Sequence, residues 1–232
     1  MIDPGADWHT HSDTSDGADS LAAMATAAGA AGLHTLGLSD HVRTTTTWLP
    51  DYVATVRGLR VEGLQVRCGV EVKMLDAGGR LDLPSALPEL DYLLVADHQY
   101  PGADGPVHPN DVRADIAAGR YSAAEAVEQL VAATCAAIRA SPCPAIVAHP
   151  FSLLPKCGLD EADVTEALLD ELASAAVASD AAFELNEKWR CPSPRALAHL
   201  ASRGVRLTAG SDAHRTLDVG RWSYLLEPGV AP

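Results

Sequence analysis

Seven apolar runs with the length and residue types of β-strands alternate with alanine- and leucine-rich stretches, at residues 6–11, 34–39, 66–72, 91–96, 145–149, 182–186 and 205–209. Strands that alternate with helices predict a parallel sheet with right-handed crossovers. Histidine or carboxylate side chains stand at or near the ends of six of these runs. An open sheet binds its ligand at one switch point with few strand ends, so this pattern favours a closed or nearly closed barrel.

The stretches between the strands carry helix signals, which predict helices over residues 20–31, 122–140, 160–176 and 194–203. A hairpin turn is expected at residues 76–79, and a mobile loop at residues 102–110. No linker rich in Pro, Gly or Ser interrupts the 232 residues. We therefore expect one α/β domain over residues 1–232.

The composition of the chain argues against some classes of binding partner. The formal net charge of −14 argues against a nucleic-acid or anionic-membrane binder, which needs a basic surface. No apolar run approaches the ~20 residues that cross a bilayer, and the N-terminus lacks the features of a signal peptide. The five cysteines form no Cys-x-x-Cys pair and are expected to be mostly buried, reduced thiols. These features predict a cytoplasmic protein.

Nine side chains at the strand ends are candidate metal ligands. In His9-Thr10-His11, the period of two in an extended strand places both imidazoles on one side, and Asp212-Ala213-His214 does the same for a carboxylate and an imidazole. The full set is His9, His11, Asp16, His41, Glu71, His98, His149, Asp212 and His214.

Nine ligands are too many for a single zinc ion, which takes four. They suit two or three divalent ions, and Glu71 and Asp212 are the natural bridges because a carboxylate has two oxygens. Mixed nitrogen and oxygen ligands admit zinc, manganese or iron. Adjacent divalent cations lower the pKa of a bridging water and neutralise phosphate oxygens. This chemistry predicts hydrolysis of a phosphate ester by a metal-bridging hydroxide.

The ordered motifs resemble those of the polymerase and histidinol phosphatase (PHP) phosphoesterases. The matching segments are His9-Thr10-His11, Ser15-Asp16-Gly17, Ser39-Asp40-His41, Gly69-Val70-Glu71, His98, Ala148-His149-Pro150 and Gly210-Ser211-Asp212-Ala213-His214. The resemblance implies a distorted (β/α)7 barrel with a trinuclear site.

Carried over by position, the resemblance also implies three ligand sets. The first is His9, His11, Glu71 and Asp212; the second is Asp16, His41 and His214; the third is Glu71, His98 and His149. Among these, Glu71, Asp212 and His214 are the expected catalytic residues, because they would hold the nucleophilic hydroxide.

Polar residues that follow the metal motifs are candidates for substrate binding. They are Arg43, Lys73, Asn186, Lys188, Arg190 and Arg215. Asp40 is expected to support the ligands, with a general acid as the alternative role, and Glu184 is expected to be a buried support. Trp189 is expected either to stack on a flat leaving group or to pack.

Three further histidines are not counted as ligands. His34 and His199 are expected to be structural, and His108 is either a surface residue or a substrate contact.

The sequence therefore predicts a metal-dependent phosphomonoesterase for a small phosphorylated metabolite, which resembles histidinol phosphate or is a sugar phosphate or a nucleotide. Two alternatives stay open. A nuclease or polymerase-associated exonuclease domain would need a basic groove, which the net charge of −14 opposes. A non-catalytic metal-binding protein would hold metals without hydrolysing any phosphate ester.

Overall fold

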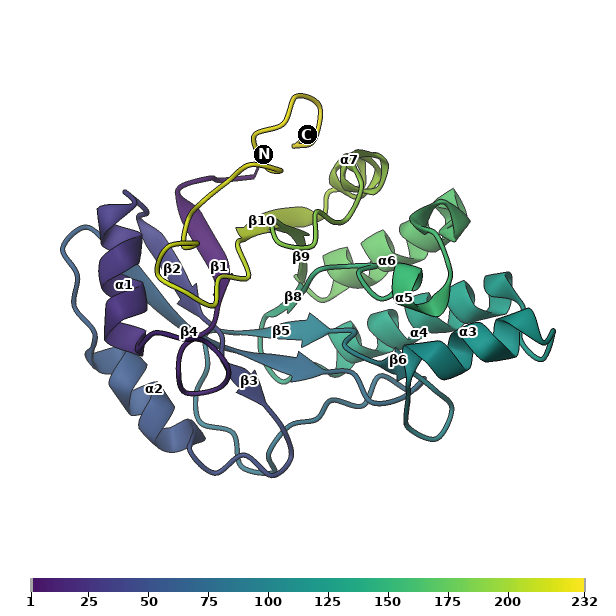
Figure 1. Cartoon of the computed structure of the whole chain (residues 1–232), viewed down its shortest axis with the longest axis horizontal. Coiled ribbons are helices and arrows are strands. Elements are labelled where there is room, and N and C mark those ends of the chain that lie inside the picture. Colours follow the sequence, from purple (N-terminus) through teal and green to yellow (C-terminus); the bar gives the residue numbers. More distant parts are fainter. Residues whose placement is uncertain (1, 232) are drawn as a thin grey trace.

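The computed structural model describes residues 2–231 and contains seven parallel strands. Their order follows the chain: β1 (Ala6–Thr10), β2 (Thr35–Leu38), β4 (Gln65–Lys73), β5 (Tyr92–Ala96), β8 (Ala145–Val147), β9 (Ala182–Asn186) and β10 (Arg206–Gly210). A short strand, β3 (His41–Val42), extends the β2 position along β4. Figure 1 shows β1 and β10 side by side, so the sheet curls into a nearly closed barrel. The predicted barrel of seven parallel strands is confirmed.

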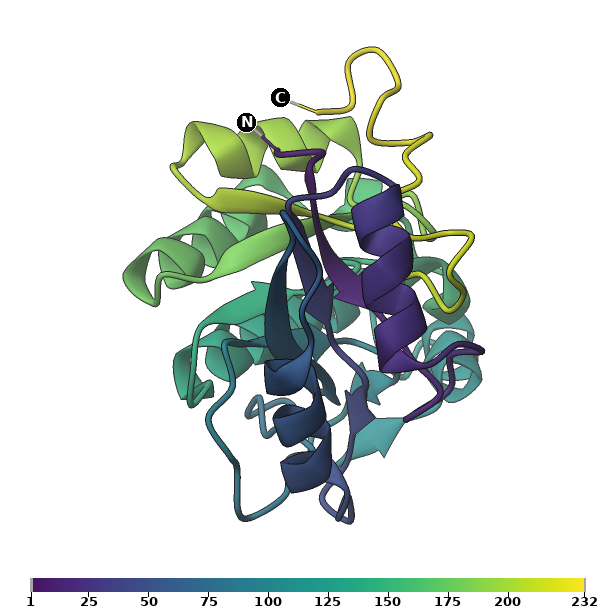
Figure 2. The ribbon, with the colours of Figure 1, turned by 90° about the vertical axis from the view of Figure 1, so that its left-hand side faces the viewer.

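Helices cover the outside of this barrel. They are α1 (Leu21–Ala30), α2 (Leu49–Gly58), α3 (Pro109–Ala117), α4 (Ala123–Ala140), α5 (Leu154–Cys157), α6 (Glu166–Ala178) and α7 (Pro194–Ser202). Figure 2 shows α1 and α2 packed along one side, in front of the first strands. Serine side chains cap several N-termini, and Ser122 forms a full capping box with Glu125 at the start of α4.

Two predicted segments differ from the structure. The helix expected from residue 160 begins at Glu166, because Asp160 caps a short 3-10 turn (Glu161–Asp163) and Thr165 then caps α6. The loop expected at residues 102–110 instead contains β7 (Pro106–Val107), which pairs with β6 (Tyr100–Pro101), and the start of α3.

The contact between β1 and β10 closes the barrel without a ladder of backbone hydrogen bonds. Past the ends of both strands, the backbone N–H of His11 donates to the carbonyl of Ala213 (2.8 Å). From within β1, the fully buried Asp7 carboxylate accepts the backbone N–H groups of Ser211 and Gly220, which follow β10, each at 3.0 Å. Burial raises the pKa of Asp7 to about 6. One side chain therefore joins the first strand to the last segments of the chain.

Tyr92 fills the middle of the barrel. Its hydroxyl donates to the carbonyl of Trp8 (2.8 Å), and its ring lies against Gly37 and Gly69 on the two intervening strands. A Cβ atom at Gly69 would lie 2.3 Å from Cζ of Tyr92, so the ring needs a residue without a side chain there. Tyr92 thus separates the two mouths of the barrel.

Candidate metal centre

All nine candidate ligands come together at the C-terminal mouth of the barrel. His9 and Glu71 lie on β1 and β4, and His41 opens β3. The others lie in the segments that directly follow β1, β5, β8 and β10. Parallel strands end at one edge, so residues far apart in the sequence meet there.

Glu71 is the centre of the cluster. Its carboxylate is 1% exposed. It lies close enough to five imidazoles to form hydrogen bonds with them or to bind the same metal ion. They are His9 (3.4 Å), His11 (3.3 Å) and His41 (3.0 Å) at one oxygen, and His98 (2.9 Å) and His149 (2.9 Å) at the other.

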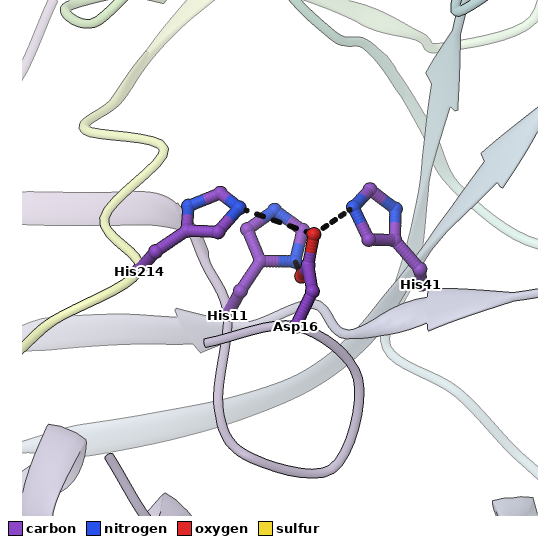
Figure 3. A group of neighbouring side chains, drawn as sticks. All are labelled: His11, Asp16, His41 and His214. Atoms are coloured by element: carbon purple, nitrogen blue, oxygen red, sulfur yellow. Dashed lines mark ion pairs between the residues drawn. The ribbon is translucent and has the colours of Figure 1, made fainter. Parts of the chain in front are cut away.

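A second group surrounds Asp16, at the more exposed side of the cluster. One oxygen of Asp16 lies 3.4 Å from Nε2 of His41 and 3.5 Å from Nε2 of His214. Figure 3 shows this carboxylate between the two rings, with His11 beside it. The loop that carries Asp16 is held by Asp40, which accepts the hydroxyls of Ser12 (2.8 Å) and Ser15 (2.6 Å). This geometry is that of a supporting residue, as expected for Asp40.

Asp212 connects the cluster to a cation and an aromatic ring. One oxygen lies 3.7 Å from Nε2 of His11, 3.4 Å from Nδ1 of His214 and 3.2 Å from Nζ of Lys188. The other oxygen accepts the indole N–H of Trp189 (3.0 Å). The backbone of Asp212 has a φ of 53°, a strained conformation for a residue other than glycine. His149 also has a positive φ, of 29°.

Buried carboxylates orient two of the imidazoles. Nδ1 of His9 lies 2.8 Å from Glu184, and Nδ1 of His149 lies 3.4 Å from Asp97. When Nδ1–H donates to a carboxylate, the lone pair of Nε2 points the other way, here toward Glu71. The sequence predicts Glu184 as a residue that supports the ligands, whereas Asp97 is not among the predicted residues. The signal for Asp97 was present, since it stands at a strand end directly before His98.

These nitrogen and oxygen atoms fit cations better than they fit one another. Nε2 of His9 and Nε2 of His11 face each other at 3.0 Å, and buried Nδ1 of His11 has no hydrogen-bond partner among residues 2–231. Donor atoms that bind one zinc ion tetrahedrally at about 2.1 Å lie about 3.4 Å apart, close to this separation. Three groups have suitable ligand spacing: His11, Asp16, His41 and His214; His9, His11 and Glu71; His41, Glu71 and His98.

The carboxylates of the cluster set up a field that attracts cations, although burial holds the pKa of His11 well below its usual range. Burial opposes ionisation of Glu71, but the imidazoles of His98 and His9 outweigh it and hold the Glu71 pKa well below its usual range. Burial likewise disfavours the charged form of His149, but hydrogen bonds with Asp97 and Glu71 raise its pKa to about 10. Divalent cations bound at the same atoms would satisfy this field in place of protons.

Two cavities flank the cluster and hold four of the predicted substrate-binding residues. A cavity of about 480 Å³ is lined by Arg43 and Lys73 together with His41, Glu71 and His98. A second cavity, of about 470 Å³, is lined by Lys188, Arg215, Asp212 and His214 together with Arg221. Gln99 and Asp82 also line the first cavity and were not predicted; Gln99 accepts from Nζ of Lys73 (3.2 Å).

Two other predicted substrate-binding residues have partners elsewhere. Asn186 is fully buried; its amide donates to Glu184 (3.1 Å) and accepts the backbone N–H of Trp189 (2.9 Å). The Arg190 guanidinium pairs with Glu227 (2.8 Å) and lies over the ring of Tyr224. Arg190 therefore contacts the C-terminal segment, and Asn186 supports Glu184 and the backbone at Trp189.

Three histidines lie outside the cluster. His34 pairs with Asp3 (3.0 Å) at the opposite mouth, and His199 on α7 pairs with Asp170 (2.7 Å). His108 caps α3, where its Nδ1 accepts the backbone N–H of Asn110 (3.2 Å). Each of these rings has a structural partner.

A parallel barrel whose strand ends gather histidines and carboxylates is a common framework of metal-dependent hydrolases. The profile of the PHP domain matches residues 7–188, so the chain belongs to this phosphoesterase family. The fold is also similar to that of hisK from Listeria monocytogenes, a protein assigned provisionally as a histidinol phosphatase. The TM-score is 0.63 at 17% sequence identity, over 93% of this chain and 97% of that one. No curated protein matches the sequence significantly.

None of the helices among residues 2–231 is long and apolar enough to span a membrane.

Proposed function

We propose that this protein is a metal-dependent phosphomonoesterase that acts on a small phosphorylated metabolite. The observation that carries the proposal is the Glu71 carboxylate, which lies within 3.4 Å of five imidazole nitrogens. Asp16 and Asp212 contact two of the same imidazoles, those of His41 and His11. Two or three divalent ions held by these nine ligands would supply the nucleophile near neutral pH and neutralise the phosphate oxygens.

The side chains around the cluster suit a phosphate monoester. Nζ of Lys188 lies 3.2 Å from Asp212, where it can bind a non-bridging phosphate oxygen, and Arg215 lines the same cavity. On the other side of the cluster, Arg43 and Lys73 can bind further polar groups of the substrate. The Trp189 side chain is 43% exposed next to His149, at a ring distance of 6.3 Å. Nζ of Lys156 lies over one face of the ring, 4.1 Å from its centroid, and the remaining exposed surface can pack on the leaving group.

The substrate class rests on these surroundings and on the likeness to hisK. Histidinol phosphate is the first substrate to test, followed by sugar phosphates and mononucleotides. The net charge of −14 disfavours a nucleic-acid substrate, so a phosphodiester is the contrasting probe.

The deciding experiment combines metal analysis of the purified protein with phosphate release from this panel. We expect two to three zinc, manganese or iron ions per chain and preferential release from one monoester. Fewer than two ions after incubation with excess metal, together with no release, would refute the proposal. Full metal content without hydrolysis of any ester would identify a non-catalytic metal-binding protein, and preferential cleavage of the phosphodiester would identify a nuclease.

A further inference from the structure

A second cavity lies at the opposite, N-terminal mouth of the barrel. It has a volume of about 220 Å³, and the first residues of four strands line it: Tyr92, Ala145, Ala182 and Arg206. The Tyr92 ring closes its inner end, because the hydroxyl reaches across to the carbonyl of Trp8. This basal cavity is therefore separate from the metal centre, and nothing in the proposed phosphatase mechanism uses it.

Two polar side chains of the basal cavity have no partner for a buried atom. Arg67 lies on the same side of β4 as Gly69 and Glu71, so its side chain points into the barrel. Nε of Arg67 and Oγ1 of Thr208 are buried and lack any hydrogen-bond partner among residues 2–231. A buried donor without a partner costs free energy, so both atoms call for an acceptor from outside the protein.

One carboxylate, that of Asp91, lines the basal cavity, and that of Asp180 lies near it; both already have partners. Asp91 pairs with both terminal nitrogens of Arg57 (2.9 Å each) and accepts the backbone N–H of Cys68. Asp180 pairs with Arg206 (3.1 Å), which remains largely exposed at the edge of the cavity. The positive charge of Arg67 is therefore unbalanced, in a chain whose formal net charge is −14.

The rest of the basal cavity wall is apolar. Trp8 and Tyr92 meet edge to face at 5.4 Å, and Ile146, Ala182 and Pro144 complete the surface. Inorganic anions gain little from such a wall, whereas an anion with a hydrocarbon or aromatic body buries apolar surface there.

We propose that the basal cavity is a second ligand-binding site, for a small organic carboxylate. The Arg67 guanidinium binds the carboxylate, the Thr208 hydroxyl donates a further hydrogen bond, and the body of the ligand packs on Trp8 and Ile146. Planar guanidinium groups match both oxygens of a carboxylate, which makes this pairing strong and directional. The site is independent of the phosphatase proposal, because it contains none of the residues of the metal centre.

The test is calorimetric titration of the metal-loaded protein with benzoate, with its neutral isostere benzamide as the comparison. The titration extends to about 10 mM, because a small ligand with one charged contact is expected to bind in the millimolar range. We expect benzoate to bind at one site per chain and benzamide to bind at least about tenfold more weakly. Arg67→Gln should weaken benzoate binding by a similar factor, and Thr208→Val by less.

Arg120→Gln is the matched control, because Arg120 is an exposed arginine that pairs with Asp115 and does not line the cavity. This variant should bind benzoate like the original protein. The melting temperature of Arg67→Gln should stay within a few degrees of the original, which shows that the loss is of binding and not of folding. Absence of benzoate binding, equal binding of benzamide, or unchanged binding by Arg67→Gln would each overturn the proposal. The last result would place any bound benzoate elsewhere, for example at the metal centre.

Discussion

The Glu71 carboxylate lies 2.9–3.4 Å from five imidazoles, whereas each of these imidazoles reaches one to three carboxylates. If the proposed ions are bound, removing Glu71 would take ligand atoms from more than one of them. We predict that Glu71→Ala lowers kcat/KM by more than about a hundredfold, since even indirect partners of a metal are worth ten- to a hundredfold. Asp212→Ala should have a similarly large effect. Steady-state kinetics and metal content, measured on the same preparations, check both.

His108→Ala is the control for these variants. Its ring only caps α3, so the change should cost about 1 kcal/mol of stability and leave kcat/KM within about twofold. If Glu71→Ala and His108→Ala had equal effects on activity, the bridging role of Glu71 would be wrong.

Lys188 and Arg190 are two residues apart but have different partners. Nζ of Lys188 lies 3.2 Å from Asp212, whereas Arg190 is bound to Glu227. If Lys188 anchors the phosphate, Lys188→Met should raise KM about tenfold, a loss of about 1.4 kcal/mol of binding, with a smaller change in kcat. Arg190→Met should leave KM unchanged. If both variants raised KM equally, contact with Asp212 would not identify the side chain that binds the phosphate.

At the scale of elements, the alternation of apolar runs and helix signals was enough to predict all seven strands of the barrel and the helices α1, α4 and α7. The helix α2 was not predicted, because Trp48 offers no side-chain cap that marks its start. The hairpin of β6 and β7 was also missed, because each strand has only two residues. Local patterns specify long buried elements well, whereas short elements depend on their tertiary surroundings.

The strands around Tyr92 depend on glycines. A Cβ atom at Gly69 would lie 2.3 Å from Cζ of Tyr92, a distance that the packed barrel interior cannot absorb without movement. We predict that Gly69→Ala lowers the free energy of unfolding by roughly 2–3 kcal/mol. Chemical denaturation checks this value.

Gly58→Ala is the matched change at the end of α2, where no atom lies within 4 Å of the added methyl group. It should be neutral or slightly stabilising, because alanine favours a helix. A double variant, Gly69→Ala with Tyr92→Leu, should lose less stability than the sum of the two single changes. Full additivity would mean that the ring is not the cause.

At the scale of the whole molecule, the metal centre gathers residues from both ends of the chain. His9 and His11 belong to the first strand, and Asp212 and His214 follow the last. The proposed ions, held between these residues, would add links between the first and last strands. The ligands at the strand ends could be predicted from the sequence. The hydrogen bonds of Asp7 that join the first strand to the last segments could not, because Ser211 and Gly220 lie more than 200 residues away in the sequence. Only closure of the barrel brings these groups together.

Removal of the metals should therefore destabilise the protein as a whole. A ligand present at about a hundred times its dissociation constant stabilises the native state by about 2.7 kcal/mol. Chelation followed by desalting should lower the melting temperature by several degrees, and added metal should restore it. A melting temperature that does not respond to chelator, in protein shown by elemental analysis to have lost its metal, would mean that the ligands are held in place without ions.

Asp7→Asn tests whether closure of the barrel and formation of the metal centre are one event. The variant keeps the shape of the side chain but replaces one of its two acceptor oxygens with a donor, so the N–H of Ser211 or Gly220 loses its acceptor. We expect a loss of about 2–3 kcal/mol of stability, together with reduced metal content, since Asp212 and His214 directly follow the freed segment. Asp3→Asn is the control, because among residues 2–231 the exposed Asp3 side chain pairs only with His34 and Gly5, and the change should alter neither quantity. If Asp7→Asn lost stability but kept its full metal content, the ions alone would hold the two strands together, and Asp7 would contribute only to folding.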